Sequence, residues 1–184
     1  TVGSQNVAVG NNALTANTTA NDNTAVGHES LTTNTTGAQN TGLGHRSLQL
    51  NTTGSQNTAV GRHSLNANTT ADNNTGVGYH ALLSNTTGTN NTALGSLALD
   101  ANTTASHNTA IGNQSLGANT TGEANTALGQ GTLSSNTTAD NNTAIGRQSL
   151  NQNITGSDVT AVGAYALDAN TTGSYNTAFG KHTL

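Results

Sequence analysis

The sequence contains no cysteine, so thiol chemistry is excluded. The side chains that could do chemistry are its histidines, serines, aspartates and asparagines. The aspartates never follow the glycine-rich spacing of calcium-binding β-helix repeats, and no serine lies in a recognisable nucleophile turn. We therefore expect no enzyme activity, no cofactor and no metal site. The six histidines are predicted to be surface residues, of which two pairs in matching repeat positions lie close together: His28 with His45 and His63 with His80, beside the separate His107 and His182.

Asparagine glycosylation is a second chemical possibility. Nine copies of "NTT" and one "NIT" match the acceptor sequence Asn-x-Thr, with their asparagines at Asn17, Asn34, Asn51, Asn68, Asn85, Asn102, Asn119, Asn136, Asn153 and Asn170. In a secreted protein each of them is an acceptor for a glycan. Alternatively, the asparagine amides stack on identical amides of neighbouring repeats and form a ladder, as in cross-β assemblies. A buried ladder cannot carry sugar, so the two interpretations exclude each other at any one site.

These residues are placed by a repeat of 17 residues. Aligned on the first residue of "NTAVG", the repeats begin at residues 6, 23, 40, 57, 74, 91, 108, 125, 142, 159 and 176. Ten complete repeats fill residues 6–175, and partial repeats lie at both ends. The consensus is N-T-A-φ-G-x-x-S-L-x-x-N-T-T-G-x-x, where φ is an apolar residue; we number its positions 1 to 17.

The repeat positions differ in what they accept. Position 5 is always Gly, position 9 always Leu and position 12 always Asn, and position 4 is always apolar. The twelve formally charged residues fall only in positions 6, 7, 10, 16 and 17. This sorting indicates a folded element with an inside and an outside rather than a disordered linker.

The period and composition predict an all-β fold: one β-solenoid (a parallel β-roll) over residues 1–184, with one 17-residue repeat per coil. We expect "NTAVG" and "SL" to form short strands, and "NTTG" and the variable pairs to form turns. The constant Gly fits a corner that needs positive φ or a close backbone approach. Position 15 holds Gly or Ala and is not expected to need positive φ. The core is predicted from positions 4 and 9, for example Val60 and Leu48.

Position 3 holds only small residues. Strand alternation places positions 2 and 4 on one face and position 3 on the other. If positions 2 and 4 face inward, this uncharged row faces outward and indicates contact with another chain; the alternative is a tight corner buried within one chain. We expect the chain to associate with itself, as a trimer or as a filament joined end to end. The candidate contact row is Ala8, Ala25, Gly42, Ala59, Gly76, Ala93, Ala110, Ala127, Ala144, Ala161 and Ala178.

The phrases "NTAVG", "NTALG" and "NTAIG" resemble the head repeats of YadA-like trimeric autotransporter adhesins. The "SLxxNTTGxxNTAxG" phrasing is similar to the Asn/Thr-rich repeats of phage tail-fibre and related bacterial surface proteins. The resemblance implies a left-handed parallel β-roll, three such rolls side by side, and a role in surface attachment. It also implies that the strand alanines, here Ala25 and Ala59, face the neighbouring protomer. The repeat of this chain is longer than the usual adhesin repeat.

Four Lys and Arg residues, a net charge of −4 and the lack of a long apolar run predict neither nucleic-acid binding nor membrane insertion. The sequence favours a non-enzymatic structural module of an extracellular fibre, surface adhesin or phage tail fibre, located outside the cell, on its surface or on a virion. It would act as a stiff spacer whose variable outer residues make multivalent contacts, with host or environmental surfaces as further partners.

Ice binding is the alternative function. Threonines form ranks at positions 2, 13 and 14 of the repeat, and a flat, charge-free, outward threonine array at strand spacing can order water. Ile154 interrupts the rank at position 13. We expect these threonines to be inward or turn residues instead.

Overall fold

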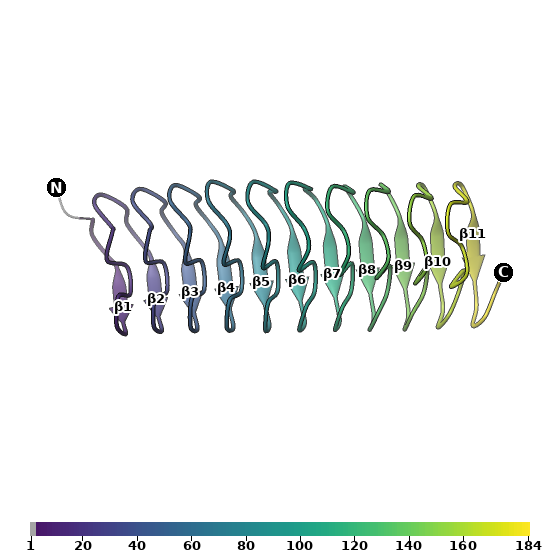
Figure 1. The fold of residues 1–184 in the computed structure, drawn as a ribbon, viewed down its shortest axis with the longest axis horizontal. Coiled ribbons are helices and arrows are strands. Elements are labelled where there is room, and N and C mark those ends of the chain that lie inside the picture. Colours follow the sequence, from purple (N-terminus) through teal and green to yellow (C-terminus); the bar gives the residue numbers. More distant parts are fainter. Residues whose placement is uncertain (1–2) are drawn as a thin grey trace.

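In the computed structural model, which describes residues 3–184, the chain forms one parallel β-solenoid (Figure 1). Each strand pairs in parallel with the strand one coil away, so the order in the sheet follows the chain from β1 to β11. The register is 17 residues throughout, as in the pair Thr58 and Thr75. The predicted fold class is confirmed. The strands are β1 (Val7–Val9), β2 (Thr24–Val26), β3 (Thr41–Leu43), β4 (Thr58–Val60), β5 (Thr75–Val77), β6 (Thr92–Leu94), β7 (Thr109–Ile111), β8 (Thr126–Leu128), β9 (Thr143–Ile145), β10 (Thr160–Val162) and β11 (Thr177–Phe179).

Only positions 2 to 4 of each coil are strand, and the rest of the coil is turn. Position 5 needs glycine for two reasons: Gly61 has φ +133°, and a Cβ there would lie 2.4 Å from the carbonyl oxygen of Gly78 in the next coil. The "SL" segment is not a strand as predicted, because Leu48 at position 9 adopts a left-handed turn with φ 50°. Position 15 does not adopt positive φ, as predicted. No helix in residues 3–184 is long and apolar enough to cross a membrane.

The interior of the coil is built from small and amide side chains around one leucine per coil. Leu48 and its equivalents from Leu31 to Leu150 are fully buried, which confirms position 9 as core. Position 3 faces the same interior, where the side chain of position 8 lies against it: the Ser64 hydroxyl donates to the Gly76 carbonyl at 2.8 Å. The space is small: Ala fits, fully buried, at Ala59 and its equivalents, whereas a Cβ on Gly76 would lie 2.6 Å from that hydroxyl oxygen.

The prediction that position 3 is a contact row between chains is therefore wrong for the buried part of the row. These residues face the interior of their own coil and are covered without a second chain. They are Ala25, Gly42, Ala59, Gly76, Ala93, Ala110, Ala127, Ala144, Ala161 and Ala178; Ala8, in the first strand, is exposed.

The assignment of position 4 to the core is also wrong. Because position 3 faces inward, alternation turns positions 2 and 4 outward. Val60 is only partly buried, and Leu43 and Leu94 are 45% and 46% exposed. The chain thus keeps its alanines inside and places its larger strand side chains on the outer surface.

Candidate functional site

The asparagines of position 12 form a ladder through the interior of the solenoid. The Asn51 Nδ2 donates to Asn34 Oδ1 in the preceding coil and to the Gly54 carbonyl in its own coil, both at 2.8 Å. The Asn51 Oδ1 accepts from Asn68 Nδ2 at 2.8 Å. From Asn51 to Asn153, both amide hydrogens and the amide oxygen of each rung are used, which confirms the ladder interpretation; at the end of the ladder, the Asn17 Oδ1 has no partner among the described residues.

The ladder leaves no place for a glycan on its buried rungs. A sugar on Nδ2 would replace a donating hydrogen and would need space that a fully buried side chain does not have. Eight of the ten candidate asparagines are fully buried: Asn34, Asn51, Asn68, Asn85, Asn102, Asn119, Asn136 and Asn153. Asn17 and Asn170, in the outer coils, are partly buried.

A second asparagine row, at position 1, clamps the coils where each strand begins. The Asn40 Oδ1 accepts the backbone amide of Asn57 at 3.0 Å, and the Asn40 Nδ2 donates to the Gly54 carbonyl at 2.8 Å. Val159 interrupts this row, and the Nδ2 of the neighbouring Asn142 has no hydrogen-bond partner among the described residues. The polar residues that make the sequence look like a linker are structural.

The outer surface of the sheet is a regular surface that runs along all eleven strands. We call it the strand face: positions 2 and 4 of β1 to β11. Threonine stacks on threonine and aliphatic on aliphatic in strict register, as in the pairs Thr75–Thr92 and Val77–Leu94. The strand face carries no charged residue, because all charges lie at other repeat positions. Its most exposed apolar side chains are Val7, Val9, Leu43, Leu94, Leu128, Ile145 and Phe179.

The threonines of positions 13 and 14 lie in a bend, as predicted for turn residues. The Thr52 hydroxyl donates to the carbonyl of Thr69 in the next coil at 3.0 Å, and Thr53 beside it is exposed. Position 2 differs from the prediction, because its threonines are outward on the sheet. Of the three threonine ranks, only the rank at position 2 therefore lies on a strand surface, and it belongs to the strand face.

Four histidines form one row of neighbouring rings along the corner that follows the strands, which we call the histidine stack: the rings of His28 and His45 are nearly parallel, at 9°, and the next two pairs are tilted by 33° and 51°. The ring centroids are 5.3 Å apart for His28 and His45, 5.2 Å for His45 and His63, and 5.4 Å for His63 and His80. The sequence predicted two separate pairs, and the contact between His45 and His63 joins them. The rings of His45 and His63 lie close together because the backbone amide of His63, at position 7, donates to the carbonyl of His45, at position 6 of the preceding coil.

The stack is an environment that disfavours imidazolium. Partial burial and the nearby Arg62 lower the pKa values of His63 and His80. The His45 Nδ1 and the His63 Nε2 are buried without a hydrogen-bond partner in the described part of the chain. A hydrogen bond from Arg46 at 2.7 Å lowers the pKa of Glu29. No three His, Asp or Glu side chains of residues 3–184 come together as metal ligands.

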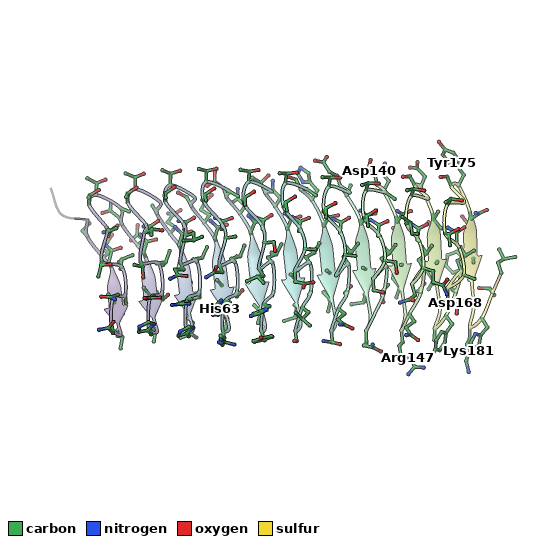
Figure 2. All side chains as sticks on the ribbon, in the orientation of Figure 1. His63, Asp140, Arg147, Asp168, Tyr175 and Lys181 are labelled. Carbon is green, nitrogen blue, oxygen red and sulfur yellow. The ribbon has the colours of Figure 1, made fainter. Side chains whose placement is uncertain are left out.

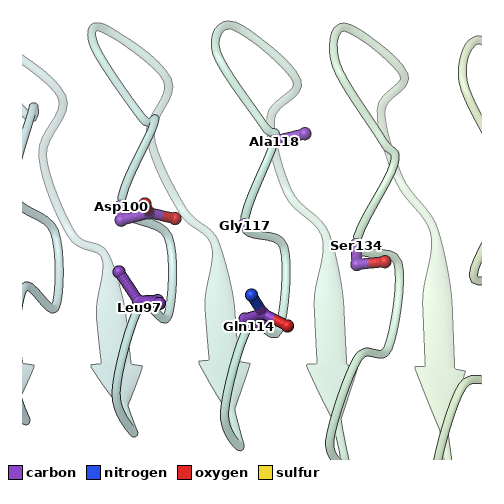
Figure 3. Close-up of a pocket in the computed structure, with 6 residues that line it drawn as sticks. All are labelled: Leu97, Asp100, Gln114, Gly117, Ala118 and Ser134. Carbon is purple, nitrogen blue, oxygen red and sulfur yellow. The ribbon is translucent and has the colours of Figure 1, made fainter.

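A hollow of about 350 Å³ spans three coils on the surface formed by repeat positions 7, 10 and 11 (Figure 3). It forms because Gly117 has no side chain at position 10, where the neighbouring coils carry Asp100 and Ser134. Leu97, Gln114 and Ala118 complete the lining. Burial raises the pKa of Asp100. The sequence analysis missed this hollow, although a glycine at a position that usually carries a side chain was the available signal.

Comparisons of the chain with protein-family models, with curated proteins and with solved structures gave no significant match. The strand face, the asparagine ladders and the histidine stack are therefore the features from which a function has to be argued.

Proposed function

We propose that this chain is a non-enzymatic structural module of an extracellular fibre, surface adhesin or phage tail fibre, and that it packs against copies of itself through the strand face. The observation that carries the proposal is the exposed aliphatic row of position 4, in which Leu43, Leu94 and Leu128 are 41–46% exposed. The resemblance to trimeric adhesin heads and tail-fibre repeats points to the same assembly, with the contact row moved from position 3 to positions 2 and 4.

The solenoid suits a spacer because its coils are bonded from end to end. Each coil is tied to the next by strand pairing, by the position 12 ladder and by the position 1 clamps. Eleven strands at about 4.8 Å spacing make a rod about 50 Å long. Bending such a rod would break several hydrogen bonds in every coil that opens, so it is stiff.

The size of the strand face favours a partner. At about 50 Å by 10 Å for eleven strands of three residues, it covers about 500 Å². The apolar part of this area is the position 4 row, and contiguous apolar patches of a few hundred Å² on soluble proteins are often binding surfaces. A standard interface buries about 800 Å² per partner, so the flanking corners must take part in the contact.

Sedimentation velocity tests this proposal. The wild-type chain is expected to sediment as an oligomer, and a variant with Leu43→Glu, Leu94→Glu and Leu128→Glu on the strand face as a monomer. The matched control is Thr53→Glu, Thr87→Glu and Thr121→Glu, three exposed turn positions off that face; it should remain oligomeric. A monodisperse wild-type monomer at high concentration would contradict the proposal.

Ice binding is the second candidate, because the outward threonine rank favours it. Ten threonines, from Thr24 to Thr177, occupy position 2 without interruption, at about 4.8 Å intervals and beside no charge. Self-association would cover the same surface, so the two functions compete for the strand face. Thermal hysteresis that Thr92→Tyr abolishes would support ice binding. Its absence at high protein concentration would dismiss this candidate.

A further inference from the structure

The two long edges of the rod carry opposite charge. Positions 6 and 7, directly after the strand, form the basic edge, and positions 16 and 17, before the next strand, form the acidic edge. Figure 2 shows Arg147 and Lys181 along one edge and Asp140 along the other. The basic edge holds all four cationic residues of the chain: Arg46, Arg62, Arg147 and Lys181. The acidic edge holds five of the eight acidic residues: Asp22, Asp72, Glu123, Asp140 and Asp158.

Most of these charges have no opposite charge beside them in the described part of the chain; Arg62 and Arg147 lie over the rings of Tyr79 and Tyr165, at 5.8 and 4.8 Å from the ring centroids, which does not neutralise their charge. Arg62, Arg147, Glu123 and Asp158 are exposed. The one acidic residue on the basic edge, Glu29, is already paired with Arg46. Asp72 and Asp140 each accept a backbone amide of the preceding coil, from Ser55 and Glu123, with one carboxylate oxygen. This bond explains why position 16 carries a side chain that can accept a hydrogen bond. The carboxylate keeps its charge, and its second oxygen stays available for a partner.

Two charges on each edge coincide along the rod, whereas Asp22, Glu123 and Asp140 have no cationic residue on the basic edge of their own coils. Arg62 and Asp72 belong to the same coil, residues 57–73, and Arg147 and Asp158 belong to the coil of residues 142–158. Between them, the edge positions of residues 74–107 carry no formal charge. Two copies that lie side by side in the same direction and in register would bring these coils together.

We infer that copies of this chain pack parallel and in register around an axis along the rod, with the basic edge of each copy against the acidic edge of the next. The inference rests on the proposed self-association through the strand face and specifies its orientation. Rotation about the rod axis makes each edge meet the opposite edge of the neighbour, and closes into a ring. An antiparallel face-to-face pair places basic edge against basic edge, which like charges oppose. The edges also supply the contact area that the strand face lacks.

Charge reversal tests the pairing of the edges. Arg62→Glu with Arg147→Glu, or Asp72→Lys with Asp158→Lys, makes both edges alike and is expected to weaken association at low salt at least tenfold. Combining all four substitutions in one chain restores opposite edges and should restore the affinity. Asp100→Lys with Asp168→Lys, which changes the charge equally at position 10, is the matched control and should leave the affinity unchanged. Equal affinities for all variants would overturn the inference.

Cross-linking tests the orientation, since the chain has no native cysteine. Ser96 at position 6 and Ser106 at position 16 lie in the coil of β6, the middle strand. The β6 coils of two neighbouring copies therefore lie side by side whether the copies are parallel or antiparallel. If the packing is parallel, Ser96→Cys chains form cross-links with Ser106→Cys chains when the two variants are mixed. Neither variant forms cross-links when it is alone. Self-cross-linking of each variant alone would show antiparallel packing and overturn the inference while leaving self-association intact. A chain that sediments as a monomer would remove both proposals.

Discussion

The position 12 row and the position 4 row divide the roles of polar and apolar side chains in an unusual way. Asn51 and its equivalents are amides that lie fully buried, whereas Leu43 and Leu94 are aliphatic side chains that lie about half exposed. From Asn51 to Asn153, each of these amides has partners above, below and within its own coil, so its burial leaves no donor unpaired. Each exposed aliphatic has a like neighbour on either side, but no cover in the single chain.

The amide row holds the coils together, whereas the aliphatic row is left uncovered on the outside of the sheet. The interior of a 17-residue coil is too narrow for many large side chains, so hydrogen-bonded amides fill it in register. The strand side chains then have room only on the outside. The interior row therefore holds one chain together, and the exterior row is the surface that the proposed self-association would use.

Breaking one rung of the ladder is expected to have the largest effect on stability. Asn85→Ala leaves two buried groups without a partner, the Asn68 Oδ1 and one hydrogen of the Asn102 Nδ2, while the Gly88 carbonyl keeps its bond from Asn74. Each unsatisfied buried group costs about 1–3 kcal/mol, so the free energy of unfolding should fall by about 4 kcal/mol. Guanidinium denaturation followed by circular dichroism measures this loss.

The control for the ladder is Thr87→Ala, two residues away at an exposed turn position. Surface substitutions of this kind change stability by about 0.5 kcal/mol or less. If Asn85→Ala cost no more than Thr87→Ala, the amide ladder would not be the element that holds the coils together.

The two leucines of one coil provide the sharpest comparison between interior and exterior. Leu99 at position 9 is fully buried, and Leu94 at position 4 is 46% exposed. Leu99→Ala should lower the free energy of unfolding by about 3 kcal/mol, as large-to-small core substitutions do. Leu94→Ala should change it by about 0.5 kcal/mol or less, measured where the chain is monomeric, and should weaken association instead.

Unfolding and sedimentation of the same two variants separate these effects. Similar losses of monomer stability for Leu94→Ala and Leu99→Ala would show that position 4 belongs to the core after all. Normal association of Leu94→Ala would argue against the strand face as the contact surface.

The sequence predicted the features that depend on constant residues. The 17-residue register, the corner glycine, the buried leucine and the asparagine ladder each follow from a position that never or almost never varies. The inward face of the strand was predicted wrongly, because positions 2 and 4 contain the larger side chains and were expected to be core. A position limited to Ala and Gly indicates restricted space, but it does not say whether that space lies inside a coil or between chains.

Charge sorting could not correct this error, because neither face of the strand carries a charge. The histidine stack was missed for a different reason. His45 and His63 occupy different repeat positions, and only the offset between position 7 and position 6 of adjacent coils brings them together. Alignment by identical positions hides contacts of this kind.

The smallest expected effect is a loss of stability in acid at the histidine stack, on the basic edge beside the strand face. The lowered pKa values of His63 and His80 mean that the folded chain binds fewer protons there than the unfolded chain does. Their contribution is therefore complete above the ordinary histidine pKa of 6.5 and is lost as the pH falls below it. Protonation would add charge beside Arg46 and Arg62, opposed by Glu29 and Asp100.

Because water screens these partly exposed rings, the loss between pH 8 and pH 5.5 should stay below about 1 kcal/mol. Guanidinium denaturation at both pH values should show a smaller loss for His63→Gln with His80→Gln than for the wild-type chain. His107→Gln, on the acidic edge, should keep the wild-type dependence, since His107 forms no ring stack with the described residues. If both variants lost the same stability as the wild type, the stack would not sense pH, and the acid response would have to come from the carboxylates.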